Sequence, residues 1–436
     1  MFNRETDRPA GESGPPCPRG WSLPSFMMTA APSMQPQARP AVLQVLPALE
    51  SGGAERGTLQ IAKALVDNGW NAIVASSGGR LVRELVATGA SHIELPVDSK
   101  NPVVIAINVL RLSKIIREHN VRLVHARSRA PAWSSAFAAK RTGISFMTTF
   151  HGVYQGYEHR LKKRYNAIMT AGDRVIAVSD YVLEHIQQVY NVDPSRIRVI
   201  RRGVDLQTFD PSLVRGHRLA ALSDRWQLGY DRKVVMLPGR VVRIKGHLVM
   251  LEAMMRMSRK DFIVLIVGDL DPSSQYVREI EKDIIRKGLT DRVHFGGHCD
   301  DMAAAYMLAD AVALPAIGPE AFGRVVIEAQ AMGKPVIVTH TGGLPETVMP
   351  AATGWLVAPD NPDELAWALD LALSMDEEVG LRLAERARHF VAEELSVDQM
   401  CCRTLDVYRE LVRDAPRPPP QAMTRADNEG QDLVNP

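Results

Sequence analysis

The 436-residue sequence predicts an α/β protein built from two facing Rossmann-like, doubly wound parallel-sheet domains. Three observations lead to this prediction. Short apolar runs alternate with segments of helical periodicity, as expected of parallel sheets covered on both faces. The alternation pauses at an irregular segment near residues 207–230 and then starts again. The chain is also too long for one typical core.

The first series of alternating elements predicts a domain over residues 41–207. Its first strand is expected within Ala41–Pro47 and its first helix at Ala54–Asp67, where apolar residues recur on one face. Another helix is expected at 103–118. Further strands are expected in the runs NAIVASS, SHIELPV, VRLVHA, SFMTTFH, DRVIAVS and RIRVIRRG.

The second series predicts a domain over residues 231–395, preceded by a linker at 208–230. Its strands are expected in RKVVMLPGR, FIVLIVGD, RVHFGGH, DAVALPA, KPVIVTH and TGWLVAP. Three helical segments end the pattern without a strand between them, and we expect the last, 396–414, to return to the first domain. Residues 1–40 and 415–436 are polar and rich in proline, so we expect both ends to be disordered.

Composition and charge exclude several classes of protein. A net charge of +2 argues against a nucleic-acid partner, which usually requires a larger basic excess. The four cysteines form no C-x-x-C pair, so neither a disulfide framework nor a zinc site is expected. The longest apolar runs are far shorter than the ~20 residues of a membrane helix. We therefore expect a cytoplasmic protein.

Parallel sheets bind ligands beyond the carboxyl ends of their strands, so residues just after each strand are the candidates for a site. Gly52 and Gly53 follow the first strand and open a helix, whose free N–H groups favour anions. A plain turn explains these two glycines equally well. His151 follows the fifth strand in TTFHG, and a histidine satisfied within the core is an equal alternative for it.

Two stretches of the second half carry stronger signals. Arg240 and Lys245 flank the loop of LPGRVVRIKGH, and two cations beside a helix start suit a pyrophosphate; a solvated basic loop is the alternative. In PEAFGRVVIEA, Glu328 follows Glu320 by slightly over two helical turns, so both are expected near one face. A glutamate on an otherwise apolar face suits hydrogen bonds from two neighbouring hydroxyls, as a ribose offers; capping of a backbone amide is the alternative.

Together these stretches resemble the family 4 glycosyltransferases, which have the two-domain GT-B fold. The segments GGAE, FHG, GRVVRIKG, PEAFGRVVIEA and GKPVIVTHTGGLPE occur in the family's order over about residues 42–395. The similarity is greatest to bacterial members that build lipopolysaccharide cores and other envelope glycans. The chain departs from the family in IRRGVD, where Arg202 replaces an asparagine that many members have.

The resemblance implies roles for the candidate residues. Arg240 and Lys245 would hold the diphosphate of a nucleoside-diphosphate sugar, Glu328 its ribose, and His151 would contact the sugar near the reacting carbon. Gly52 and Gly53 would approach the phosphate and the acceptor, and Gly342, Gly343 and Glu346 would shape the same pocket. The implied catalytic residues are His151, Arg240, Lys245 and Glu320, and the implied donor-binding residues are Gly52, Gly53, Phe322, Gly323, Arg324 and Glu328, with the backbone of 322–324 holding the donor sugar.

The resemblance also implies a reaction. The enzyme would transfer a hexose-type sugar, with retention of configuration, to a lipopolysaccharide-core or other envelope glycan or lipid acceptor. No cofactor and no metal is expected, and GDLD at 268–271 is interpreted as a strand end rather than a D-x-D metal motif. Two alternatives keep the fold: a sugar-nucleotide epimerase, and a non-catalytic nucleotide-sugar-binding subunit.

The basic segment GYEHRLKKRYNAIM, residues 156–169, leaves two interpretations open. It is either a solvated helix face, as charge runs usually are, or a peripheral contact with the anionic inner face of the cytoplasmic membrane or a lipid-linked acceptor.

Overall fold

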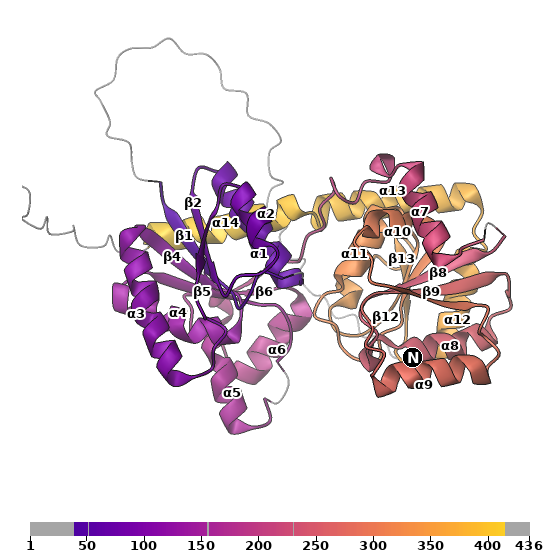
Figure 1. Ribbon diagram of the computed structural model, residues 1–436, viewed down its shortest axis with the longest axis horizontal. Helices are drawn as coiled ribbons and strands as arrows, with labels where there is room; N and C mark the ends of the chain where they lie inside the picture. The colour runs from indigo at the N-terminus through magenta and orange to yellow at the C-terminus, as the bar shows by residue number, and fades with distance from the viewer. Residues whose placement is uncertain (1–38, 51, 155–156, 230, 415–436) are drawn as a thin grey trace, which may run out of the picture. The chain divides into compact units, whose positions relative to one another are not determined.

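The computed structural model describes residues 39–50, 52–154, 157–229 and 231–414 (Figure 1). The ends predicted to be disordered lie outside the described residues, apart from residues 39 and 40. Two fully parallel sheets organise the rest, one of seven strands in the order β3-β2-β1-β4-β5-β6-β7 and one of six in the order β10-β9-β8-β11-β12-β13. The prediction of two Rossmann-like domains is confirmed; we call them the first and second lobes.

The first lobe follows the predicted alternation closely. Its first strand, β1, pairs with β2 and β4 and is buried along its whole length, which explains why its sequence AVLQV is apolar apart from Gln44. The strands are β1 (Ala41–Val45), β2 (Asn71–Ser76), β3 (Ser91–Glu94), β4 (Val121–Ala126), β5 (Ser145–Phe150), β6 (Arg174–Ala177) and β7 (Ile197–Val199). The helices are α1 (Gly53–Asp67), α2 (Val82–Ala87), α3 (Pro102–Glu118), α4 (Arg129–Thr142), α5 (Arg160–Asn166) and α6 (Asp180–Tyr190).

The second lobe repeats this scheme with β8 at the centre, between β9 and β11. Its strands are β8 (Lys233–Pro238), β9 (Phe262–Val267), β10 (Val293–Gly297), β11 (Ala311–Leu314), β12 (Val336–Thr339) and β13 (Gly354–Val357). Its helices are α7 (Gly216–Trp226), α8 (His247–Arg256), α9 (Gln275–Arg286), α10 (Met302–Leu308), α11 (Arg324–Ala331), α12 (Pro362–Leu373) and α13 (Glu377–Glu394). In each lobe the chain adds strands first on one side of its first strand, β1 or β8, and then on the other side. The order therefore switches between β1 and β4 and between β8 and β11, and the loops after these strands lie at the crevice where such sheets bind ligands.

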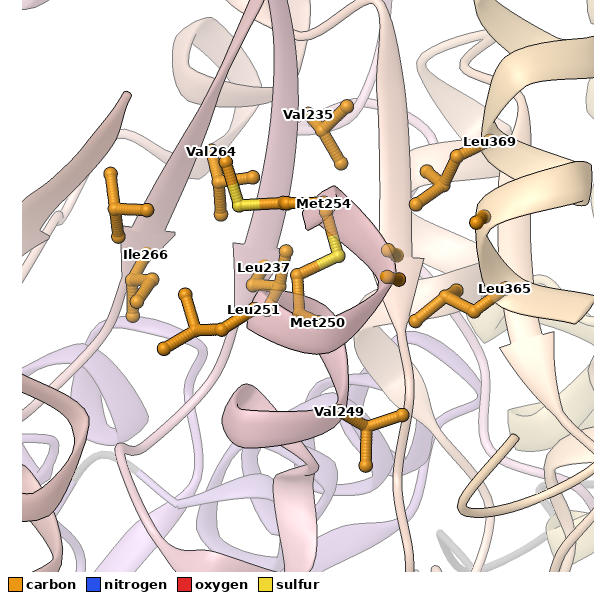
Figure 2. Close-up of a cluster of buried hydrophobic side chains, with 14 of the residues drawn as sticks. Val235, Leu237, Val249, Met250, Leu251, Met254, Val264, Ile266, Leu365 and Leu369 are labelled. Carbon is orange, nitrogen blue, oxygen red and sulfur yellow. The ribbon is translucent and has the colours of Figure 1, made fainter. Parts of the chain in front are cut away.

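Each sheet is covered on both faces, so each lobe has two apolar layers. In the second lobe, α8, α9 and α12 cover one face and α7, α10 and α11 cover the other (Figure 1). Figure 2 shows the first of these layers, where Met250 and Met254 of α8 lie between the strands and Leu365 and Leu369 of α12. These two buried layers fix the positions of the strand ends, and therefore of the loops that follow them.

The segment 208–230, predicted as a linker, instead contains a helix of the second lobe. Leu222 and Trp226 lie one turn apart on α7 and are buried in the core, and Trp226 donates through Nε1 to the carbonyl of Gly296 at 3.0 Å. These two apolar residues span a single helical turn, and a pattern this short did not predict a helix from the sequence. The passage between lobes lies earlier, where Val204 bonds to the backbone of Leu395 and Val397 at 2.9 Å each.

The last helix, α14 (Val397–Asp414), returns to the first lobe as expected. Met400, Leu405 and Tyr408 are buried there with residues of β1 and α1. The Tyr408 hydroxyl also lies 2.7 Å from Nδ1 of His125 on β4. Across the described ranges, no helix combines the length and apolarity that a membrane span requires.

Candidate functional site

The loops after β8 and β11 are fastened to each other at the carboxyl edge of the second sheet. Ile317 donates its backbone N–H to the carbonyl of Ile244 at 2.9 Å. Gly246 has φ +74°, and a Cβ there would lie only 1.7 Å from the carbonyl oxygen of Pro315. Only glycine permits this approach. The sequence GRVVRIKG therefore delivers its cations beside the PEAFG loop.

The two predicted cations differ in their surroundings. Lys245 Nζ lies 2.7 Å from Glu320 Oε1, and both side chains are about four-fifths buried, with 18% and 19% of their surfaces exposed. Arg240 is exposed, and its side chain makes no hydrogen bond or ion pair to the described residues. Two residues predicted to have separate roles, Lys245 and Glu320, thus form one unit, with a free guanidinium on the same loop.

The start of α11 is shaped by Phe322 and Gly323. Phe322 is buried against Val204, Ile327 and their neighbours, so only its backbone is free to face a ligand, as the resemblance implies. Gly323 has φ +100°, and a Cβ there would lie 2.4 Å from the side chain of Leu344. The helix begins at Arg324, which leaves Glu320 in the loop before it. The expectation that Glu320 and Glu328 share one helix face is wrong.

Glu328 accepts hydrogen bonds from two side chains that approach from different elements. Arg324 Nη2 lies 3.0 Å from Oε1, and the hydroxyl of Tyr306, on α10, lies 3.1 Å from Oε2. Burial raises the pKa of Glu328, while Arg324 and the hydroxyl of Tyr306 oppose that rise. The partners are side chains rather than the backbone amide considered from the sequence. Sequence reasoning missed Tyr306, whose apolar neighbours on α10 gave no sign of a polar role.

A cavity of about 600 Å³ opens against Arg324 and Glu328, a volume suited to a small-molecule ligand. It lies between α1 of the first lobe and the loop before α10 in the second. Arg240, Lys245 and Glu320 do not line this cavity, although Glu320 belongs to the same PEAFGR segment as Arg324, which does. Its other lining residues are Arg56, Leu59, Gln60, Lys63, Glu84, Thr88, Asp205, Thr208, Phe209, Arg218, Cys299, Asp300, Asp301, Met302 and Ala303.

In the first lobe, His151 is positioned as a neutral hydrogen-bond donor. Arg202 Nη1 lies 3.5 Å from His151 Nδ1, and because a guanidinium only donates, this contact favours the tautomer with the proton on Nε2. Burial lowers the pKa of His151 well below its usual value, and Arg127 and Arg202 lower it further. Nε2 is buried without a partner among the described residues. Gly152 brings this loop to the PEAFG loop, since a Cβ there would lie 3.7 Å from that of Ala321.

Gly52 and Gly53 begin α1, and Gly53 lies close to two arginines. Gly52 is the N-cap and makes no side-chain cap. Arg202, only 7% exposed, donates to the carbonyl of Gly53. Arg127 is 4% exposed and donates through Nη1 to Gln44 Oε1 at 3.1 Å. Sequence reasoning did not single out Arg127, although its place directly after β4 marked it as a strand-end residue.

Glu346 was expected to shape the pocket and instead joins the two lobes. Its carboxylate accepts from the backbone amides of Asp180 at 2.9 Å and Tyr181 at 3.0 Å, and from Arg201 Nε at 3.1 Å. It thereby caps the N-terminus of α6 from the other lobe. Gly343 supports the PEAFG loop, donating to the carbonyl of Glu320 at 2.8 Å.

Two family models match the chain, one on each lobe. The model described as Glycosyltransferase Family 4 matches residues 51–208, and the model described as Glycosyl transferases group 1 matches residues 221–390. A D-inositol 3-phosphate glycosyltransferase of Salinispora arenicola is 30% identical over 325 residues, which are 66% of this chain and 69% of the relative. The protein of the same name from Xylanimonas cellulosilytica is 34% identical over 253 residues, 57% of this chain and 60% of the relative.

Solved structures show the same fold. A glycosyltransferase from Rickettsia africae has 38% sequence identity and a TM-score of 0.81, over 87% of this chain and 100% of that one. Anabaena HepE in complex with UDP-glucose has a TM-score of 0.73 at 22% identity, over 85% of this chain and 100% of its own, and this likeness concerns the fold alone.

The first three curated relatives are matched over only 54–60% of their own length. The family models nevertheless cover both lobes in order, and a relative matched over more than two thirds of its length agrees with them. The chain belongs to the family 4 glycosyltransferases and has their GT-B fold.

Proposed function

We propose that the protein transfers a hexose-type sugar from a nucleoside-diphosphate sugar to a glycan or glycolipid acceptor of the bacterial envelope, lipopolysaccharide cores included, with retention of configuration. The observation that carries this proposal is the arrangement around the PEAFGR segment. Within this segment, Glu320 pairs with Lys245, and Arg324 pairs with Glu328 in the wall of the cavity. The free Arg240 lies on the same loop as Lys245.

The donor would contact the side chains paired with this segment at two places. Glu328, at the cavity wall, offers carboxylate oxygens to the ribose hydroxyls, with Arg324 and Tyr306 as its supports. Arg240 and Lys245 would bind the diphosphate, whose charge exceeds what a helix start alone can neutralise. The UDP-glucose bound in the Anabaena structure belongs to this class of donor.

The reaction breaks the bond between the anomeric carbon and the diphosphate oxygen and forms a bond from that carbon to an acceptor oxygen. Negative charge develops on the leaving diphosphate, where Arg240 and Lys245 would stabilise it. The leaving phosphate would take the acceptor's proton on the same face, so configuration is retained. His151 would donate Nε2–H to an oxygen of the donor sugar. We assign no cofactor and no metal to this step.

The acceptor side includes a surface that suits an anionic membrane. Helix α5 carries Arg160, Lys162, Lys163 and Arg164 around Leu161, whose side chain is 86% exposed. An exposed leucine among cations favours peripheral contact with anionic lipid at the inner face of the cytoplasmic membrane.

Liposome flotation tests this contact. The protein should float with anionic but not neutral vesicles, and Leu161→Asp should reduce the floating fraction severalfold. An exposed apolar substitution on the second lobe, Leu381→Asp, serves as the control. Equal recovery of wild type and Leu161→Asp would contradict the membrane contact.

A donor screen with purified protein tests the proposed reaction. Release of nucleoside diphosphate should require both a donor and an acceptor, and the acceptor panel should contain lipopolysaccharide cores as well as D-inositol 3-phosphate, the compound in the relatives' names. An epimerised sugar formed without any acceptor would favour the epimerase. Calorimetric binding of nucleoside diphosphates without turnover on any acceptor would favour a non-catalytic subunit.

A further inference from the structure

Two arginines of the first lobe are buried without an acidic partner among the described residues. Arg127 and Arg202 are 4% and 7% exposed. Their hydrogen-bond acceptors are neutral: the side chain of Gln44 for Arg127, and the carbonyl of Gly53 and Nδ1 of His151 for Arg202. Nε of Arg127 is buried and has no partner in the described part of the chain. A buried charge is costly unless an opposite charge lies beside it, so Arg127 and Arg202 lack an anionic partner in the free protein.

A third arginine approaches the same place from the second lobe. A Cβ on Gly53 would lie 3.2 Å from Nη1 of Arg324 and 3.9 Å from Nη2 of Arg202. Both guanidinium groups thus lie within 4 Å of one point above the start of α1. The carboxylate that pairs with this group of three is Glu328, which accepts from the other terminal nitrogen of Arg324. Glu55 lies close by on α1 but turns towards Gly52, where it would lie 2.3 Å from a Cβ.

We propose that Arg202 and Arg324, with Arg127 behind them, bind an anionic group of the acceptor, a phosphate or a carboxylate. This inference rests on the proposed transferase function and names a chemical class of acceptor for it. An anion beside Gly53 could accept charge-assisted hydrogen bonds from both guanidinium groups, because both lie within 4 Å of one point there.

The position of the pair favours the acceptor over the donor. Arg240 and Lys245 already provide the charge for the diphosphate at the edge of the second sheet, whereas Arg127 and Arg202 follow strands of the first lobe. A cavity of only about 10 Å³ lies beside Arg127 and Arg202, and its lining includes His125 and Thr149. It has room for about one water and not for an anion. The anion therefore lies on the Gly53 side, which faces the second lobe.

The repulsion between Arg202 and the neighbouring arginines also predicts how the stability of the protein responds to substitution and to added phosphate. Burial, and then Arg324 and Arg127, lower the pKa of Arg202 well below its usual value, so the charged side chain is held unfavourably. Arg202→Asn should therefore leave the melting temperature of the phosphate-free protein unchanged or raise it. Wild type should instead be stabilised by added phosphate, because a ligand that binds only the folded state shifts the unfolding equilibrium.

Calorimetry on protein saturated with UDP tests the site while the donor phosphate positions are filled. Inorganic phosphate and D-inositol 3-phosphate are the two probes. Arg202→Asn should weaken binding of both at least tenfold, Arg202→Lys should recover part of that loss, and the UDP affinity should change less than twofold. The surface arginine variant Arg198→Asn, whose side chain pairs with Glu410, is the matched control. Absence of phosphate binding to UDP-saturated wild type, or equal binding to Arg202→Asn, would overturn the proposal.

Transfer assays separate the acceptor from the donor as the source of the anion. Arg202→Asn should lower kcat/KM at least tenfold more with a phosphorylated acceptor than with the same acceptor lacking the phosphate, where any loss reflects the contact of Arg202 with His151. Equal losses with both acceptors would assign the arginines to the diphosphate and refute an acceptor site. Failure of the proposed function looks different, since wild type would then release no nucleoside diphosphate with any acceptor.

Discussion

Replacement of Lys245 by alanine tests the assignment of the diphosphate site most directly. The substitution removes one cation and leaves Glu320 without its partner at 2.7 Å. Exposed ion pairs contribute about 0–1 kcal/mol and fully buried ones lose about 3–5 kcal/mol when one partner is removed. With about a fifth of each side chain exposed, we expect the variant to lose about 1–2 kcal/mol of stability, a fall of about 2–8 °C in melting temperature for a lobe of this size.

The catalytic effect should be larger than the effect on stability. Removal of one group that stabilises developing negative charge typically lowers kcat by about 10²–10³-fold, or about 2.7–4 kcal/mol. We expect Lys245→Ala to reduce kcat by that factor, because the interaction strengthens as the diphosphate leaves, with a smaller change in KM. Release of nucleoside diphosphate under saturating donor and acceptor measures kcat, and a thermal melt of the same sample measures stability.

Arg243→Ala is the matched control because it removes a cation from the same short turn. Arg243 is exposed, pairs with Glu279 and stacks on Tyr276 at 4.7 Å, away from Glu320. Its kcat should stay within threefold of wild type. If Lys245→Ala retained a kcat within threefold of wild type while its melting temperature fell, the lysine would serve only the fold, and the assignment to the diphosphate would fail.

Three further predictions concern the same segment and the lobe contact. Burial raises the pKa of Glu328, so its carboxylate is protonated at a higher pH than that of a free glutamate. The affinity for nucleoside diphosphates should therefore fall as the pH drops through that raised pKa. In calorimetry, Glu328→Gln should bind about 30-fold more weakly at pH 7 and lose most of this pH dependence. Gly323→Ala combines φ +100° with a Cβ 2.4 Å from Leu344 and should cost at least about 1–3 kcal/mol in a chemical unfolding curve; an unchanged midpoint would show that the loop relaxes freely. Glu346→Ala should cost about 3 kcal/mol and speed amide exchange at Asp180, whereas unchanged exchange there would argue against the cap.

The alternation of strands and helices was readable because each strand is buried on both faces and each helix on one. β9, for example, is a run of six apolar residues with every position buried. The same logic located His151 and Arg240, since a residue directly after a parallel strand must lie at the carboxyl edge of its sheet. Gly53 lies further along, at the end of the loop that follows β1. The shared face of Glu320 and Glu328 was predicted wrongly because Gly323 delays the start of α11 until Arg324.

The sequence by itself therefore determined the two-lobed architecture and the edge of each sheet at which the candidate residues lie, because local periodicity and strand order set both. Only the tertiary structure decided which side chains meet. Arg202 bonds to Gly53 across 149 positions, and Glu346 to the amide of Asp180 across 166. The physical reason is that burial and pairing of a charge depend on loops brought together from different strands and lobes, which no local pattern encodes.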